Sequence, residues 1–210
     1  MNNNLFNKEK YFELQEIAKG LGYSQNFKNE IEKPFETYYN FQYKDKKDIC
    51  IIAGMVYSWM PTKLDLYFKD DYDWNKLDEL VKKYLNKDDS CRFELLYELC
   101  SNINHSIVGS SKILHLLKPD YGPIYDSRVI EEWNYFFNYN ENIKLNNFSF
   151  YNNETKSIKH DKLINLIDIY IRIYWDNLLL WIKNIDNQIS VRDIEILFYF
   201  INKEKNKRKN

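Results

Sequence analysis

The chain has 210 residues, of which 44% are hydrophobic and 17% aromatic, and its formal net charge at pH 7 is −1. This length suits one domain, and the apolar content excludes a disordered chain, which combines low hydrophobicity with high net charge. Because the net charge is close to zero, any binding of nucleic acid or of an acidic membrane requires a local cluster of basic side chains. Only five glycines and four prolines are present, which favours helices over a turn-rich β-sandwich.

The first half of the chain is predicted to be a series of helices. Apolar side chains recur at helical spacing over residues 8–21 and 73–85, and the aromatic segment Phe35–Tyr43 is also expected to be helical. The segment between Asp45 and Pro61 is apolar nearly all round, which places it at the centre of the core. A further amphipathic helix is expected over residues 90–100.

The second half is predicted to begin with a loop and a tight turn at Gly109, followed by a short helix from Ser110 that Pro119 closes. A turn cluster then leads to a helix that Asp126 heads. Residues 138–160 are polar and rich in asparagine, so we expect a long loop there, with a small β-hairpin near 145–158.

Two amphipathic helices are expected to complete the chain, over residues 162–185 and 191–201. The sequence thus predicts an all-α fold, a two-lobed array of about eight to ten helices. We expect one helical domain over residues 1–202 and a basic disordered tail over 203–210.

Three widely spaced cysteines are expected to be small buried side chains in a reducing compartment, and no Cys/His cluster predicts a metal site. The N-terminus lacks the apolar core of a signal peptide, and no apolar run approaches the roughly 18 residues of a membrane span. We therefore expect a cytoplasmic protein with no membrane partner, no cofactor and no obligate protein partner.

The segment from Gly109 to Val129 is the most informative for function. The first amides of a helix have no partner within that helix and can hold a phosphate or a carboxylate, and Lys112 adds a positive charge nearby. Asp126 follows an extended Pro-Ile-Tyr link, with Arg128 two residues later. A purely structural interpretation is also open, in which Ser110 and Asp126 only cap two helices.

This segment resembles the second half of the motif of the helix-hairpin-helix DNA glycosylases, which are base-excision enzymes. Those proteins have a glycine turn, a short aliphatic helix, and a proline-containing link to an aspartate at the head of the next helix. Gly109, Ile113–Leu114, Pro123–Ile124 and Asp126–Val129 occupy the corresponding places. Upstream, residues 51–60 resemble the buried helix whose end contributes to the base pocket or the DNA wedge in the same family.

The resemblance implies an all-α protein that binds DNA and excises a base. Asp126 would be the essential aspartate, and the amides around Gly109 would grip a phosphate. The residues that the resemblance and their positions place in the nucleic-acid site are Gly109, Ser110, Ser111, Arg128, Tyr57, Trp59 and His115. Lys112 would contact phosphate or act covalently as the catalytic lysine, although the family's lysine position, counted back from Asp126, falls on Val108.

Three hypotheses follow from the sequence. The protein is a DNA glycosylase, a relative of that fold that binds DNA without catalysis, or an unrelated all-α interaction protein in which Asp126 and Arg128 only cap and pair. A pocket of base size beside Asp126 favours the first hypothesis over the second, whereas an Asp126 buried against the amides of its own helix, with no cleft beside it, favours the third.

Overall fold

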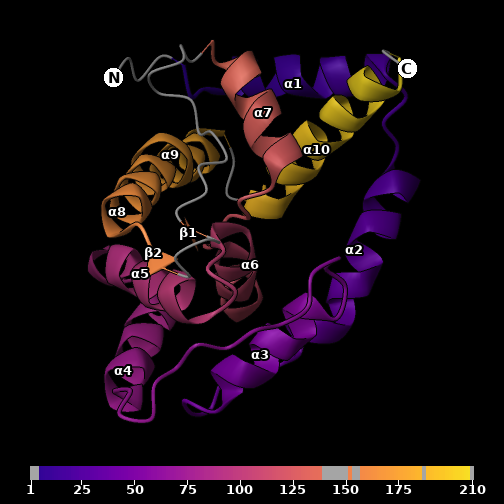
Figure 1. The fold of residues 1–210 in the computed structure, drawn as a ribbon. Helices are drawn as coiled ribbons and strands as arrows, with labels where there is room; N and C mark the ends of the chain where they lie inside the picture. Colours follow the sequence, from indigo (N-terminus) through magenta and orange to yellow (C-terminus); the bar gives the residue numbers. More distant parts are fainter. Residues whose placement is uncertain (1–4, 139–150, 153–156, 186–187, 209–210) are drawn as a thin grey trace.

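The computed structural model describes residues 5–138, 151–152, 157–185 and 188–208, and it confirms the all-α class (Figure 1). In these residues the α-helices are α1 Lys8–Gly20, α2 Gln25–Tyr39, α3 Asp48–Tyr57, α4 Trp74–Leu85, α5 Arg92–Asn102, α6 Ile107–Leu117, α7 Ser127–Phe136, α8 His160–Ile169, α9 Asp176–Ile185 and α10 Val191–Lys207. A 3₁₀ turn, Asp89–Cys91, precedes α5, and a π-helical turn, Tyr170–Trp175, joins α8 to α9.

Helices α6, α7 and α10 each begin beside a polar side chain that accepts a hydrogen bond from one of the first free backbone amides. The Ser106 hydroxyl accepts from the Gly109 amide at the start of α6, and the Asp126 carboxylate accepts from the Arg128 amide at the start of α7. Ser190 and Asp193 form a reciprocal capping box at the start of α10. These caps fix where the three helices begin.

The helices enclose one connected cluster of buried apolar side chains. Helix α6 lies near the middle of the molecule and contacts α3, α5 and α2, while α10 packs along α7 (Figure 1). Helix α1 packs against α9 and α10. The indole rings of Trp133, Trp175 and Trp181 are fully buried, as expected for core aromatics.

The start of α6 differs from the sequence-based prediction. The helix begins at Ile107 and not at Ser110, so Gly109 lies inside its first turn. The preceding turn is made by Asn104 and His105, whose φ angles of 50° and 46° are left-handed. Gly109 is required for packing instead, because a Cβ atom there would lie 1.9 Å from the hydroxyl oxygen of Tyr57.

The predicted disordered tail is also wrong for residues 203–207, because α10 continues to Lys207. Two contacts with α7 hold the polar C-terminal end of α10, and the basic composition of residues 203–207 does not predict them. The Asn202 amide donates to the Glu131 carboxylate, and Lys205 forms an ion pair with the buried Glu132. Residues 209–210 lie outside the described part of the chain.

A short antiparallel pair, β1 Tyr151–Asn152 with β2 Ser157–Ile158, lies where the small hairpin was expected, and residues 145–150 and 153–156 lie outside the described part. The expected long helix is found as α8, the π-helical turn and α9 in succession. Among the described helices, none combines the length and the apolar character that a transmembrane span requires.

Candidate functional site

A pocket of about 240 Å³ opens where α2, the end of α3, α6, α7 and α10 meet. Its described walls combine apolar and aromatic side chains with three cations and one carboxylate. The lining residues are Ile31, Phe35, Trp59, Lys112, Ile124, Asp126, Arg128, Val129, Arg192, Ile196 and Tyr199. Four residues singled out from the sequence, namely Trp59, Lys112, Asp126 and Arg128, thus come together around one cavity.

Asp126 is half-buried, and only one of its two carboxylate oxygens has a partner among the described residues. Its Oδ1 atom accepts a hydrogen bond of 2.9 Å from the Arg128 amide and so caps α7. Its Oδ2 atom has no hydrogen bond or ion pair with any residue that the structure describes. The helix-cap interpretation is therefore correct but incomplete, because one carboxylate oxygen stays available at the pocket wall.

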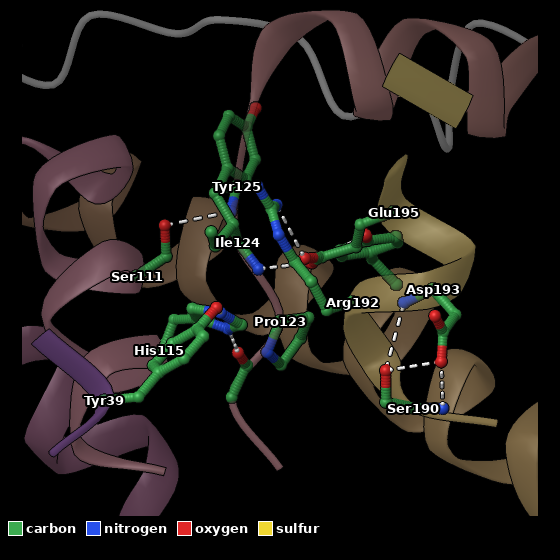
Figure 2. A network of polar contacts seen from close by, with 12 residues as sticks. Tyr39, Ser111, His115, Pro123, Ile124, Tyr125, Ser190, Arg192, Asp193 and Glu195 are labelled. Atoms are coloured by element: carbon green, nitrogen blue, oxygen red, sulfur yellow. Dashed lines mark hydrogen bonds and ion pairs between the residues drawn. The ribbon is translucent and has the colours of Figure 1, made fainter. Parts of the chain in front are cut away.

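Two buried side chains of α6 hold the main chain that leads to Asp126 (Figure 2). The Ser111 hydroxyl accepts from the Tyr125 amide at 2.9 Å. The His115 Nδ1 atom lies 2.8 Å from the Gly122 carbonyl oxygen, which only accepts, so Nδ1 carries the proton and Nε2 accepts from the Tyr39 hydroxyl at 3.2 Å. Burial lowers the pKa of His115 to about 3. The imidazole is therefore neutral, and its two hydrogen bonds hold the Gly122 carbonyl in place.

Two further buried side chains hold the same link from the other side. The Tyr170 hydroxyl, on the π-helical turn, donates to the Pro123 carbonyl at 2.5 Å. The Glu195 carboxylate of α10 accepts from the Ile124 amide at 2.5 Å and from the Tyr174 hydroxyl at 3.2 Å (Figure 2). With four side chains from α6, the π-helical turn and α10 attached to consecutive residues, the backbone before Asp126 is held in one conformation.

Glu195 is the most perturbed carboxyl group beside the pocket. Its side chain is fully buried. Desolvation raises its pKa to about 7, against the opposing effects of Arg192 and of the hydrogen bonds from Ile124 and Tyr174. This carboxyl group therefore changes its charge in the neutral pH range.

Lys112 lies on α6 with its ammonium 4.7 Å from the centre of the Trp59 indole ring. Burial lowers its pKa, Asp126 raises it and Arg192 lowers it further. Lys112 and Asp126 thus interact electrostatically, but Lys112 forms no ion pair or hydrogen bond with the described residues. The ammonium remains free to meet a ligand.

Two arginines complete the charged lining. The Arg192 guanidinium lies 4.8 Å from the centre of the Phe35 ring, and its Nη1 atom lies 3.4 Å from Glu195 Oε2. Arg128 is exposed at the rim, where its Nη1 atom donates to the Tyr199 hydroxyl at 2.8 Å. The three cations therefore differ in depth, with Arg192 shielded and Arg128 open to solvent.

The remaining residues predicted for a nucleic-acid site do not line the pocket. All of them are buried, and of these only Ser111 and His115 contact the link before Asp126. The buried residues are Tyr57, Gly109, Ser110, Ser111 and His115. The Gly109 amide is already satisfied by the Ser106 hydroxyl at 3.1 Å. The predicted phosphate grip at this helix start is thus wrong in its placement, because α6 starts earlier and turns its first residues into the protein.

Sequence reasoning missed Arg192, Glu195 and Phe35. A usable signal was present for Glu195, which interrupts an apolar run on α10 and so places a carboxyl group on a core-facing position. Nothing in the sequence indicates that Arg192 and Phe35 meet near Asp126, because the three lie on distant segments of the chain.

The described residues contain no group of three or more His, Cys, Asp or Glu side chains placed to hold a metal ion. The chemistry available at the pocket is instead that of one carboxylate oxygen, three cations and an aromatic wall. Comparisons with models of protein families, with curated proteins and with solved structures found no match for this chain.

Proposed function

We propose that the protein is a divergent relative of the DNA glycosylases that binds DNA at this pocket and hydrolyses the N-glycosidic bond of one nucleotide. One observation carries the proposal: the Asp126 oxygen that has no partner in the described part of the chain lies in the same pocket as Lys112, Arg128 and Trp59. The resemblance and the positions of these residues in the sequence assign each of them a role in such a site, and Trp59 reaches the pocket from a separate segment of the chain.

The negative charge of the Asp126 carboxylate suits a reaction in which positive charge develops on the sugar. Breaking an N-glycosidic bond develops positive charge on the sugar, and a carboxylate held beside that sugar stabilises it. Such stabilisation is most effective when the group needs no reorganisation at the moment of reaction. The four buried side chains that hold residues 122–125 supply this rigidity.

The size and lining of the pocket suit a single base. Its volume of about 240 Å³ lies below the roughly 300 Å³ from which pockets for drug-sized ligands begin. Enzymes that act on a base in duplex DNA extrude it into a pocket of this kind and stack it on aromatic or apolar side chains. Trp59, Ile124 and Val129 offer such surfaces here.

Because the net charge of the chain is close to zero, attraction of the DNA phosphates has to come from local cations such as those at the pocket. Phosphate contacts position a protein on DNA without reading its sequence. Lys112 and Arg128 lie on either side of the Asp126 link, on α6 and α7, so they replace the helix start near Gly109 as the source of phosphate contacts.

The substitution Asp126→Asn tests the proposal, because asparagine keeps the helix cap and removes the charge. Base release from duplexes that each carry one damaged or mismatched base is measured beside DNA binding by fluorescence anisotropy. We expect base release to fall by roughly 100-fold or more while the dissociation constant stays unchanged. Asp168→Asn, on an exposed carboxylate paired with Arg172, is the matched control.

Two results separate the proposal from its alternatives. Equal base release by the Asp126→Asn variant and the wild-type protein refutes the catalytic role of Asp126. Tight DNA binding by a wild-type protein that releases no base from any duplex identifies instead a relative of the fold that binds DNA without catalysis.

A further inference from the structure

Two cations in the pocket, Lys112 on α6 and Arg192 on α10, have donors without acceptors among the residues that the structure describes. The Lys112 ammonium forms no hydrogen bond or ion pair with the residues that the structure places. The Arg192 Nε atom is buried and likewise has no partner among them. The side chain of Arg192 is only 13% exposed, so water does not readily satisfy this donor.

The two cations are held on a common aromatic platform. Lys112 lies over the ring of Trp59 and Arg192 over the ring of Phe35, at 4.7 and 4.8 Å from the ring centres. The two rings themselves pack edge to face, with their centres 4.6 Å apart. This platform brings like charges from two helices into one pocket. Burial lowers the pKa of Lys112, Asp126 opposes that shift, and the charge of Arg192 adds to it.

The nearby carboxylates leave the Lys112 ammonium and the Arg192 Nε atom without an acceptor among the described residues, although Glu195 pairs with Arg192 Nη1. Asp126 caps α7 and is not in ion-pair contact with either cation in the described structure. Glu195 receives the Ile124 amide and the Tyr174 hydroxyl, and it meets only the Nη1 atom of Arg192. Unpaired donors on shielded cations are costly unless an anion completes them.

We propose that Lys112 and Arg192 together bind a phosphate group of the ligand, with the ammonium and the guanidinium Nε donating to different oxygens of that group. Phosphate suits the pair because arginine presents its N–H groups in a planar fork that matches an oxyanion, while lysine acts as a point charge. The identification of this phosphate as that of a nucleotide rests on the proposed function. The site lies inside the pocket and is separate from the buried start of α6.

The test uses inorganic phosphate with the full chain and no DNA. The Trp59 indole signal in a ¹⁵N-labelled sample, assigned with Trp59→Phe, reports on occupancy beside Lys112, and calorimetry gives the affinity. Wild-type protein is expected to bind saturably with a shift of this signal. Lys112→Met and Arg192→Gln are each expected to weaken binding by roughly tenfold or more, as for the loss of one charge-assisted hydrogen bond.

Lys203→Met is the matched control, because Lys203 lies 5.2 Å from the centre of the Phe27 ring, outside the pocket. Its phosphate affinity is expected to equal that of the wild-type protein. Arg192→Gln also removes the charge beside Glu195, so Lys112→Met, which leaves that contact intact, decides the question if Arg192→Gln does not fold.

The outcomes are distinguishable from those for base excision. The absence of saturable phosphate binding, or binding that Lys112→Met leaves unchanged, overturns the phosphate site whatever the protein does to DNA. Phosphate binding that both substitutions weaken, by a protein that releases no base, upholds the site and removes the glycosylase proposal.

Discussion

Replacing Glu195 by glutamine is expected to remove one component of the pH dependence of folding. The carboxyl group is fully buried, and its pKa is raised from 4.5 to about 7 in the folded protein. Between these two values the folded state binds more protons at this group than the unfolded state does. The contribution of Glu195 to the stability of the wild-type protein is therefore fully present below pH 4.5, and it is lost as the pH rises through 7.

The size of the effect follows from the two pKa values. One pKa unit corresponds to about 1.4 kcal/mol, so ionised Glu195 lowers the free energy of unfolding by roughly 3 kcal/mol above neutral pH. Glutamine keeps an oxygen that accepts from the Ile124 amide and the Tyr174 hydroxyl, and it cannot ionise. From pH 5 to pH 8 the stability of the Glu195→Gln variant is thus expected to rise by roughly 2.5 kcal/mol relative to the wild-type protein, because the wild-type protein has lost a small part of this stability already at pH 5.

Urea unfolding of both proteins at pH 5, 6, 7 and 8 measures this difference, since all other titrating groups contribute equally to the two series. Glu94→Gln, on a half-exposed carboxylate paired with Lys76, serves as the control and is expected to parallel the wild-type curve. If the gap between Glu195→Gln and the wild-type protein is the same at pH 5 and pH 8, the buried carboxyl group is not the source of the pH dependence and the reasoning fails.

Two further predictions concern residues whose roles the structure changed. Gly109→Ala is expected to lower the free energy of unfolding by about 1–3 kcal/mol in urea, because the new Cβ atom meets the buried Tyr57 ring. Phosphate affinity is expected to stay unchanged, and a selective loss of that affinity at full stability would restore Gly109 to the binding site. Lys205→Met is expected to lower the melting temperature through a loss of about 1–3 kcal/mol, since the buried Glu132 carboxylate loses its ion pair. A melting temperature equal to that of the wild-type protein would show that the end of α10 is not held against α7.

Local patterns in the sequence were sufficient for much of the helical fold. The helix-capping roles of Asp126 and Ser190 were predictable because a cap is a contact within three residues. The start of α6 was not predictable in this way, because glycine is typical of turns, whereas Gly109 lies inside the first helical turn. The turn is instead made by Asn104, a residue type that tolerates left-handed backbone, and by His105.

The candidate site was predictable only along one stretch of the chain. Lys112 and Asp126 are 14 residues apart in sequence, and their meeting follows from one helix and one short link. Arg192 and Phe35 reach the same pocket from α10 and α2 through tertiary packing, which no periodicity specifies. The burial of Ser110, Ser111 and His115 was not predictable either, because most of α6 is buried and a polar residue type does not indicate which face of a helix it occupies.

The π-helical turn at Tyr170–Trp175 determines in which direction the side chains of the following helix α9 point. An α-helix turns through about 100° per residue, so each extra residue within a turn rotates the later side chains by that angle. At the start of this turn, the Tyr170 hydroxyl donates to the Pro123 carbonyl. Beyond the turn, the Trp181 indole donates to the Asn7 carbonyl at 2.8 Å. Gain or loss of a single residue in this turn would keep one of these two contacts and displace the other. The length of the turn therefore has to be kept if the same helix is both to support the link before Asp126 and to anchor the N-terminal segment.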